Sequence, residues 1–268
     1  MKETVLIAGG SGYVGQALCK SFAEGAYKDR YDVIIADIKR PESNENRFYK
    51  FDITKRKSVE RLVKKIKKSK DRVFHFVNLI GAMFEKQGLT SMENTSYNQI
   101  CDTINLNVTG ALYLAKLMGE YLIPHEKGED RSLTMVSSIN ARVGLSIPFY
   151  SAAKAAIEGY VKPATLDLGR YGVRVNGASL GTIQTEETLK QQKNFVEREK
   201  SAALRRLTTP EGAAKSIRAL INDLKCTAGH ILVVDCGQSA NGSQSLFDQT
   251  RRGETPSSGP EKYKKYML

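Results

Sequence analysis

Tyr150 and Lys154, four residues apart, are the side chains of this sequence best suited to acid–base chemistry. The alanines around them predict a helix, and residues i and i+4 share one face of a helix. A free tyrosine has a pKa of about 10, and a neighbouring ammonium favours the phenolate, so we expect Lys154 to lower that pKa. Such a tyrosine can give a proton to a carbonyl oxygen or take one from an alcohol. The competing interpretation is a tyrosine packed on the core with its lysine in solvent.

A glycine-rich turn lies between the first apolar run, residues 5–8, and a helical pattern that includes Ala17 and Phe22. Strand, glycine turn and helix in this order form the context of a dinucleotide-binding fingerprint. The glycines permit a tight turn, close approach to a pyrophosphate and close packing of the helix on the strand, and the helix N-terminus attracts the phosphates. The alternative is a plain strand-to-helix loop. The residues assigned to the cofactor here are Gly9, Gly10, Ser11, Gly12, Tyr13, Val14 and Gly15.

Asp37 ends the second apolar run, residues 33–36, near the position of the acidic residue in such fingerprints. A carboxylate there accepts hydrogen bonds from the adenosine ribose hydroxyls and repels a 2′-phosphate, which favours NAD over NADP. Lys39 and Arg40 follow directly and could contact a phosphate, so NADP stays open. Asp37 could also be a polar residue that simply closes a strand.

Short apolar runs alternate with helical patterns along the chain, which predicts a parallel sheet with helices on both faces. The runs lie at 5–8, 33–36, 48–53, 73–77, 132–138, 173–179 and 231–234. We therefore expect one doubly wound, Rossmann-type α/β domain over 1–237. Ligands of such sheets bind beyond the carboxyl ends of the strands, where Asp37, Asn78, Ser138 and Thr185 fall. Residues 238–268 are polar and predict a weakly ordered tail, with docking on a neighbouring subunit as the alternative.

The chain has 268 residues and a formal net charge of +12, and much of its excess of lysine and arginine is local, at 55–70 and 251–265. Lysines flank the apolar stripe of the helix predicted around 59–66, and we favour a solvated basic face over a site for an anionic partner. No nucleic-acid partner is expected. The four cysteines show no C-x-x-C spacing, which indicates free thiols in a reducing compartment. We find no signal peptide and no apolar run of about 18 residues, so we expect a cytoplasmic protein without a membrane span.

Taken together, the motifs resemble those of the short-chain dehydrogenase/reductase family over about residues 3–237. The motifs that carry the resemblance are the glycine turn at 9–15, Asp52-Ile53, Asn78–Gly81, Asn107-Val108-Thr109-Gly110, Ser138, Tyr150-x-x-x-Lys154, Arg174-Val175-Asn176, Gly181 with Thr185, and Asp235-Cys236-Gly237. The resemblance implies an NAD(P)(H)-dependent oxidoreductase that moves a hydride between a nicotinamide and an alcohol or ketone. It also implies a homodimer or homotetramer. The three histidines are far apart in the sequence and no cysteine has a histidine at ligand spacing, so we expect no metal site.

The resemblance gives the matching residues their expected catalytic roles. Tyr150 is the general acid/base, and Lys154 lowers its pKa and holds the nicotinamide ribose. Ser138 binds the substrate oxygen, with Ser137 as the adjacent alternative. Asn107, preferred to Asn105, orients a water that relays protons. The other cofactor contacts implied are Asp52 and Ile53 at the adenine, Asn78 and Gly81 beside the adenosine ribose, Gly181, and Thr185 at the carboxamide.

Several positions depart from the family pattern. Ala8 stands where a threonine is usual, Leu79 and Ile80 alter the loop before Gly81, and Cys236 replaces a glycine. The glycine spacing resembles the longer, sugar-nucleotide branch of the family. Inside the Tyr150 helix, Pro163 predicts a kink, because proline lacks the N–H of a helical bond and crowds the preceding turn.

Two other functions are weighed against the oxidoreductase. A dinucleotide-sensing or scaffold protein without turnover would not need the tetrad Asn107, Ser138, Tyr150 and Lys154. A sugar-nucleotide epimerase or dehydratase would need a larger substrate domain than the polar residues after 237 can build. The segment 182–207 is expected to cover the substrate, and its basic residues weakly indicate an acidic compound.

Overall fold

The computed structural model of the protein describes residues 2–41, 46–69, 71–84, 94–124, 128–144, 147–190 and 192–240. Within these ranges seven parallel strands form one sheet in the order β3-β2-β1-β4-β5-β6-β7. The chain order reverses between β1 and β4, which confirms the predicted doubly wound fold. The strands are β1 (Glu3–Ala8), β2 (Tyr31–Asp37), β3 (Arg47–Lys50), β4 (Val73–Asn78), β5 (Arg131–Ser138), β6 (Val173–Leu180) and β7 (Ile231–Val234).

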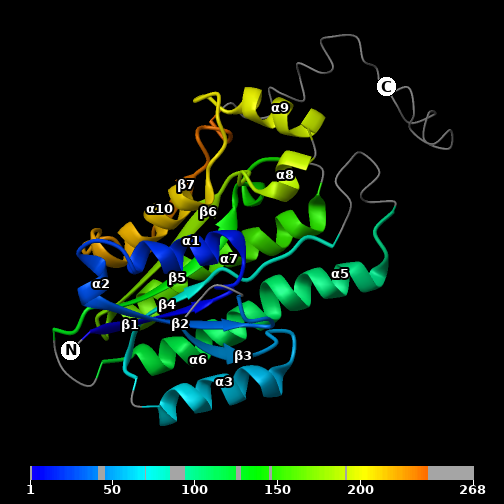
Figure 1. Ribbon diagram of the computed structural model, residues 1–268. Coiled ribbons are helices and arrows are strands. Elements are labelled where there is room, and N and C mark those ends of the chain that lie inside the picture. The colour runs from blue at the N-terminus through cyan, green and yellow to red at the C-terminus, as the bar shows by residue number, and fades with distance from the viewer. Residues whose placement is uncertain are drawn as a thin grey trace.

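The helices connect these strands and lie on both sides of the sheet (Figure 1). The helices are α1 (Tyr13–Phe22), α2 (Tyr27–Arg30), α3 (Arg56–Lys68), α5 (Tyr97–Ile104), α6 (Ala111–Leu122), α7 (Pro148–Gly169), α8 (Glu186–Lys190), α9 (Gln192–Ser201) and α10 (Pro210–Asn222). A π-helix, Asn105–Gly110, joins α5 to α6, and a short 3-10 helix, Ile139–Ala141, follows β5.

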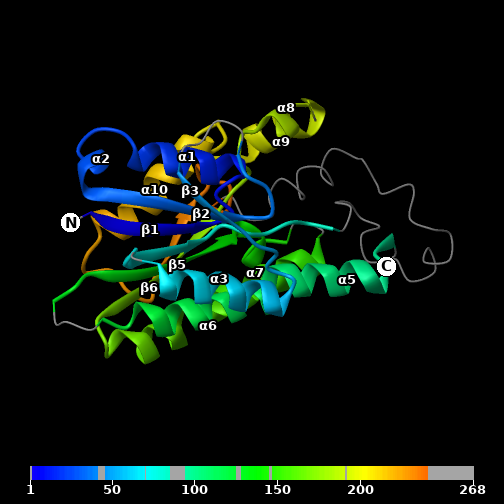
Figure 2. The same cartoon turned by 60° about the horizontal axis from the view of Figure 1, so that its bottom comes forward.

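Two apolar clusters fill the space between the sheet and its two helical layers. Alternate side chains of β1 point to opposite faces, as the period of a strand requires. Val5 and Ile7 pack in the cluster beneath α1 and α10, whereas Leu6 and Ala8 pack in the cluster on the side of α3, α6 and α7. Figure 2 shows α1 and α10 on one side of the sheet and α3 and α6 on the other. Because all seven strands are parallel, their carboxyl ends lie at one edge of the sheet.

Two predicted elements differ from the structure. The run at 48–53 ends as a strand at Lys50, because the Asp52 carboxylate accepts hydrogen bonds from the backbone N and hydroxyl of Thr54, 2.9 and 2.6 Å away, and so forms a turn. The long helical pattern through 100–115 is interrupted by the π-helix. A π-turn inside a helix is rare and frequently occurs at functional sites.

Helix α7 carries Tyr150 and Lys154 and runs without a break through Pro163. Pro163 and Gly159, whose carbonyl loses its helical partner, are both exposed, so water can bind the carbonyl. The proline therefore does not end the helix, and a kink at this point stays a prediction.

The chain after β7 remains attached to the fold over its described length. Gln238 accepts a hydrogen bond from Thr182 N at 2.7 Å, and Ser239 N donates to the Asp235 carboxylate at 2.7 Å. Residues 241–268, most of the predicted tail, lie outside the described residues, and the division into a catalytic domain, 1–237, and a tail stays a prediction. No helix in the described part of the chain is long and apolar enough to cross a membrane.

Candidate active site

The glycine turn has the close packing that its sequence predicts. Gly9 has φ +84°, a conformation that favours glycine. A side chain at Gly15 would place its Cβ 2.3 Å from the carbonyl oxygen of Gly9, so α1 can lie this close to the turn only with glycine there. Gly12 is the N-cap of α1 and makes no side-chain cap, which leaves the first N–H groups of the helix for an anion.

Asp37 lies against this turn at the end of β2. One oxygen of its carboxylate accepts a hydrogen bond from Ser11 N at 3.0 Å, and the other accepts one from Ile38 N at 2.6 Å. The Ser11 hydroxyl donates to the carbonyl of Lys39 at 2.6 Å. The carboxylate, Ser11 and the glycines are therefore held together at the carboxyl edge of the sheet.

A cavity of about 220 Å³ opens beside the turn and runs over the ends of β1, β5 and β6. Its lining includes three of the turn glycines, Gly9, Gly12 and Gly15. It also includes Val136 of β5 and Thr185 from beyond β6, two residues far from the turn in sequence. The structure thus brings the predicted phosphate turn and the predicted carboxamide contact into one cavity.

Tyr150, Ser138 and Lys154 meet where α7 passes the end of β5. Ser138 makes a hydrogen bond with the Tyr150 side chain and accepts one from Asn140 N at 3.3 Å. Ser137, the alternative, donates its hydroxyl hydrogen bond to the carbonyl of Lys154 at 3.0 Å and is buried. Ser138, and not Ser137, therefore stands beside the phenol.

The Lys154 side chain is only 3% exposed. Its Nζ donates to the carbonyl of Val136 at 3.2 Å and lies 5.5 Å from the centre of the Tyr150 ring. Burial lowers the pKa of Lys154 to about 8. The ammonium is thus held between the phenol and a residue that lines the cofactor cavity.

The expectation that Lys154 lowers the pKa of Tyr150 is wrong for this structure. Burial raises the pKa of Tyr150 to about 12, and the hydrogen bond with Ser138 lowers it by a smaller amount. Both ionisable groups are withdrawn from water, and desolvation penalises a phenolate as it penalises an ammonium. The phenol is therefore protonated at neutral pH, which is the form of a proton donor.

Asn107 is buried within the π-helix, whereas Asn105 is partly exposed. Its side-chain amide donates to the carbonyls of Ala82 and Thr103, at 2.7 and 3.0 Å, and its oxygen accepts from Ala82 N at 3.2 Å. A Cβ at Gly81 would lie 2.6 Å from Lys154 Nζ and 2.9 Å from Asn107 Oδ1. Gly81, Asn107 and Lys154 are thus immediate neighbours, as predicted for one site.

The remaining predicted cofactor residues lie along the same edge of the sheet. Asn78, at the end of β4, is buried and accepts a hydrogen bond from Ile80 N at 3.1 Å. Ile53 is buried. A Cβ at Gly110 would lie 2.4 Å from the carbonyl oxygen of Ile53, so the turn after β3 packs closely on the π-helix. Thr185 N donates a hydrogen bond to the hydroxyl of Thr188 at 2.7 Å.

The structure also reveals positioning contacts that the sequence did not. Arg142, which follows the 3-10 helix after Ser138, donates from Nε to Glu158 of α7 at 2.7 Å. Gln238 connects to Thr182 at the end of β6 through two hydrogen bonds, at 2.7 and 3.3 Å. Cys236 has φ +53°, which explains why the family pattern has glycine there. Of these features, only the cysteine in place of glycine at position 236 could be noted from the sequence.

Comparison with known proteins places this geometry in a family. The sequence profile described as "Enoyl-(Acyl carrier protein) reductase" matches residues 15–239. An uncharacterized oxidoreductase of Schizosaccharomyces pombe is 30% identical over 244 residues, which cover 88% of this chain and 90% of the relative. Carbonyl reductase family member 4 of Xenopus tropicalis is 26% identical over 240 residues, which cover 88% of this chain and 98% of that protein.

A solved structure agrees. ElxO with NADP bound has a TM-score of 0.78 and 26% sequence identity, and the match covers 90% of this chain and 100% of ElxO. The chain therefore belongs to the short-chain dehydrogenase/reductase family. It is an NAD(P)-dependent oxidoreductase that acts on alcohol or carbonyl groups.

Proposed function

We propose that Tyr150 moves the proton in this oxidoreductase and that Ser138 and Lys154 position the reacting groups. The observation that carries the proposal is the hydrogen bond between Tyr150 and Ser138 with the buried Lys154 ammonium one helical turn away. Two hydroxyl groups side by side can both bind one substrate oxygen. The bound nicotinamide would supply or accept the hydride.

In the reducing direction, Tyr150 donates its proton to the carbonyl oxygen while Ser138 donates a hydrogen bond to the same oxygen. The proposed proton source for Tyr150 is Lys154, whose pKa of about 8 allows it to exchange protons near neutral pH. Asn107 holds Ala82, next to Gly81, through two hydrogen bonds. We infer that this clamp fixes the loop beside Lys154 and that a water ordered by Asn107 completes the relay.

The residues at the carboxyl edge fit a dinucleotide. Gly15 and Gly9 allow an approach that a Cβ would block, and α1 presents an uncapped N-terminus. We propose that Asp37 accepts hydrogen bonds from the adenosine ribose and thereby selects NAD. Its carboxylate already bonds Ser11 N, so a 2′-phosphate would meet a negative charge at that place. NADP is the alternative, since Lys39 and Arg40 follow on the exposed side.

We further propose a homo-oligomer formed through the outer face of α7. This face carries small or short exposed residues, including Ala152, Ala155 and Gly159, and Leu166 is 79% exposed. Exposed apolar surface of this kind favours association. Light scattering should give a dimer or tetramer for the wild type and a smaller species for Leu166→Glu. The cytoplasm stays the expected compartment.

A panel of alcohols and ketones tests the proposed activity and cofactor preference together. Each compound is mixed with NAD(H) or NADP(H), and turnover is followed by nicotinamide absorbance. We expect turnover with at least one secondary alcohol or ketone and a higher kcat/KM with NAD(H). Binding of dinucleotide without any turnover would instead support the sensing protein, and a preference for NADP(H) would contradict the role of Asp37.

A further inference from the structure

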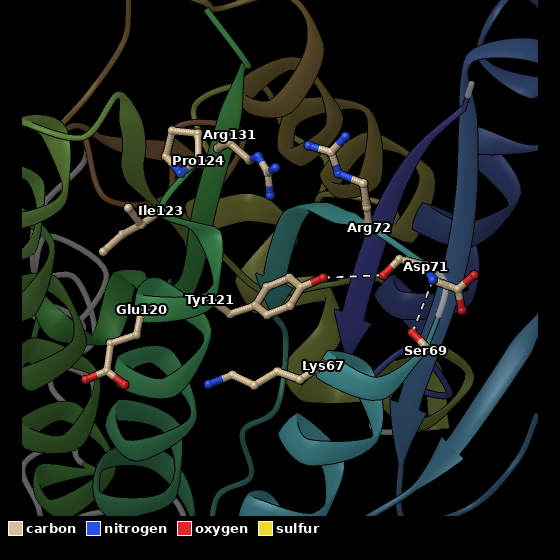
Figure 3. A pocket seen from close by; sticks show the side chains of 9 residues that line it. All are labelled: Lys67, Ser69, Asp71, Arg72, Glu120, Tyr121, Ile123, Pro124 and Arg131. Atoms are coloured by element: carbon tan, nitrogen blue, oxygen red, sulfur yellow. Dashed lines mark hydrogen bonds between the residues drawn. The ribbon is translucent and has the colours of Figure 1, made fainter. Parts of the chain in front are cut away.

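Figure 3 shows a second cavity, of about 530 Å³. It lies at the edge of the sheet opposite to the glycine turn. Arg72 precedes β4 and Arg131 begins β5, whereas Asn78 and Ser138 end these two strands at the catalytic edge. The last turns of α3 and α6, with the residues that follow each helix, complete the described lining. The cavity is therefore separated from the cofactor cavity by the full length of β4 and β5.

Among the residues that the structure describes, three cationic side chains line this cavity: Lys67, Arg72 and Arg131. Arg72 and Arg131 share the single carboxylate of Glu129, Arg131 by a hydrogen bond of 2.5 Å. This trio keeps one positive charge. Lys67 has no ion pair with any residue in the described part of the chain and adds a second.

The two acidic side chains of the lining do not cancel this excess, because each already has a basic partner. Asp71 is paired with Arg47 of β3, and Glu120 is paired with Lys116 on the same helix. These pairs are neutral. Counted over the residues that the structure describes, the cavity therefore has a local excess of two positive charges, which matches a dianion.

Arg131 is the residue that points to a ligand. It is only 3% exposed, and its Nη1 donates to the carbonyl of Val73 at 3.0 Å. Its Nε is buried and has no hydrogen-bond partner among the described residues. Its guanidinium lies 4.5 Å from the centre of the Phe74 ring. A buried donor without an acceptor is costly in a folded protein and rare, and it belongs to a guanidinium that lines this cavity.

The wall of the cavity also has apolar surface. Tyr121 uses its hydroxyl within the protein, accepting from Val73 N at 3.2 Å and donating to the Asp71 carbonyl at 3.3 Å, so its ring forms a wall. In Figure 3 this ring lies between the side chains of Lys67 and Arg131. Ile123 adds a second apolar surface. A ligand would thus meet positive charge and hydrocarbon together.

We propose that this cavity binds a small dianion with an apolar body, with Lys67 and Arg131 contacting the anion and Tyr121 and Ile123 contacting the body. Aryl phosphate monoesters have this chemistry. The carboxyl end of α3 also favours a positive side chain, so Lys67 alone would not indicate a ligand. A ligand site is indicated by three observations together: the buried guanidinium, the excess of positive charge and a volume in the usual range for small-molecule sites.

The test is calorimetric titration of phenyl phosphate into the full chain saturated with NAD, so that the phosphate cannot occupy the glycine turn. We expect one saturable site per chain. Lys67→Ala should weaken binding by about tenfold. Lys68→Ala removes the same charge from the adjacent exposed position outside the cavity, and it should weaken binding by less than about twofold. Ile123→Trp, which fills the cavity without a change of charge, should abolish binding.

Several outcomes would overturn the proposal. The absence of saturable binding to the wild type would do so directly. Equal losses in Lys67→Ala and Lys68→Ala would show only general attraction to the basic face of α3. Unchanged binding in a folded Ile123→Trp variant would show that the ligand binds elsewhere. Equal affinity for inorganic phosphate would show that the apolar surface does not contribute to binding.

Discussion

Replacing Lys154 by methionine should stabilise the folded protein while it removes activity. Burial moves the pKa of Lys154 from 10.5 to about 8, and at about 1.4 kcal/mol per pKa unit this corresponds to a cost of about 3 kcal/mol for the buried ammonium at neutral pH. Methionine has a similar shape and no charge. It leaves the Val136 carbonyl without its hydrogen bond, which costs about 1 kcal/mol. The expected net gain at pH 7 is about 2 kcal/mol.

The sign of this gain depends on pH in a defined way. Below pH 8 lysine is protonated in both the folded and the unfolded chain, so the cost is complete. Between about 8 and 10.5 the unfolded chain binds more protons than the folded chain, and the stability of the wild type rises with pH. Above pH 10.5 Lys154 is neutral in both the folded and the unfolded chain, so the cost of burying its ammonium is gone. The variant then differs from the wild type only by the hydrogen bond that it lacks. The stability difference between Lys154→Met and wild type should therefore shrink and reverse over this range.

Urea unfolding without cofactor, followed by circular dichroism at pH 7 and at high pH, measures this difference. Lys162→Met is the matched control, because Lys162 lies on the exposed side of the same helix. It should change stability by less than about 0.5 kcal/mol at either pH. A Lys154→Met variant that is less stable than wild type at pH 7, or a difference that does not change with pH, would refute the reasoning.

Three further variants probe the cofactor turn and the catalytic loop. Asp37→Ser should raise the KM for NAD and improve the relative kcat/KM with NADP, whereas no shift between the two cofactors would contradict its role. Gly15→Ala should abolish dinucleotide binding, because its Cβ would meet a backbone oxygen at 2.3 Å, while Gly212→Ala, at the same position in its helix but with its nearest contact at 3.4 Å, should keep it. Removing the tie from Arg142 to Glu158 with Arg142→Met should lower kcat with little change in the KM for NAD, and an unchanged kcat would show that the tie is not needed.

The fold could be predicted because its signals are local. Each buried parallel strand is a short apolar run, and each run is followed by a helical pattern with turn residues between them. Gly15 and Asp37 could be interpreted for the same reason, since the strand before each residue fixes its place at the carboxyl edge. The resemblance gave Asn107 and Ser138 their expected roles, and the structure brings both close to the Tyr150 helix.

The features that the sequence did not predict depend on distant contacts. The π-helix around Asn107 forms where the side chain bonds the backbone of Ala82, and helical period alone cannot indicate that contact. The pKa of Tyr150 follows how deeply the phenol is buried, which spacing to Lys154 does not reveal. The tie of Gln238 to Thr182 joins segments far apart along the chain, so composition pointed instead to a tail that begins at 238.

The most direct test of the proposed mechanism is the Tyr150→Phe variant, compared with wild type on the substrate that the panel identifies. The variant loses only the hydroxyl, so dinucleotide affinity measured by nicotinamide fluorescence should be unchanged. Loss of a general acid lowers turnover by about 10²- to 10⁴-fold, and we expect kcat to fall by that much. A Tyr150→Phe variant with kcat within a fewfold of wild type would show that the proton comes from another group.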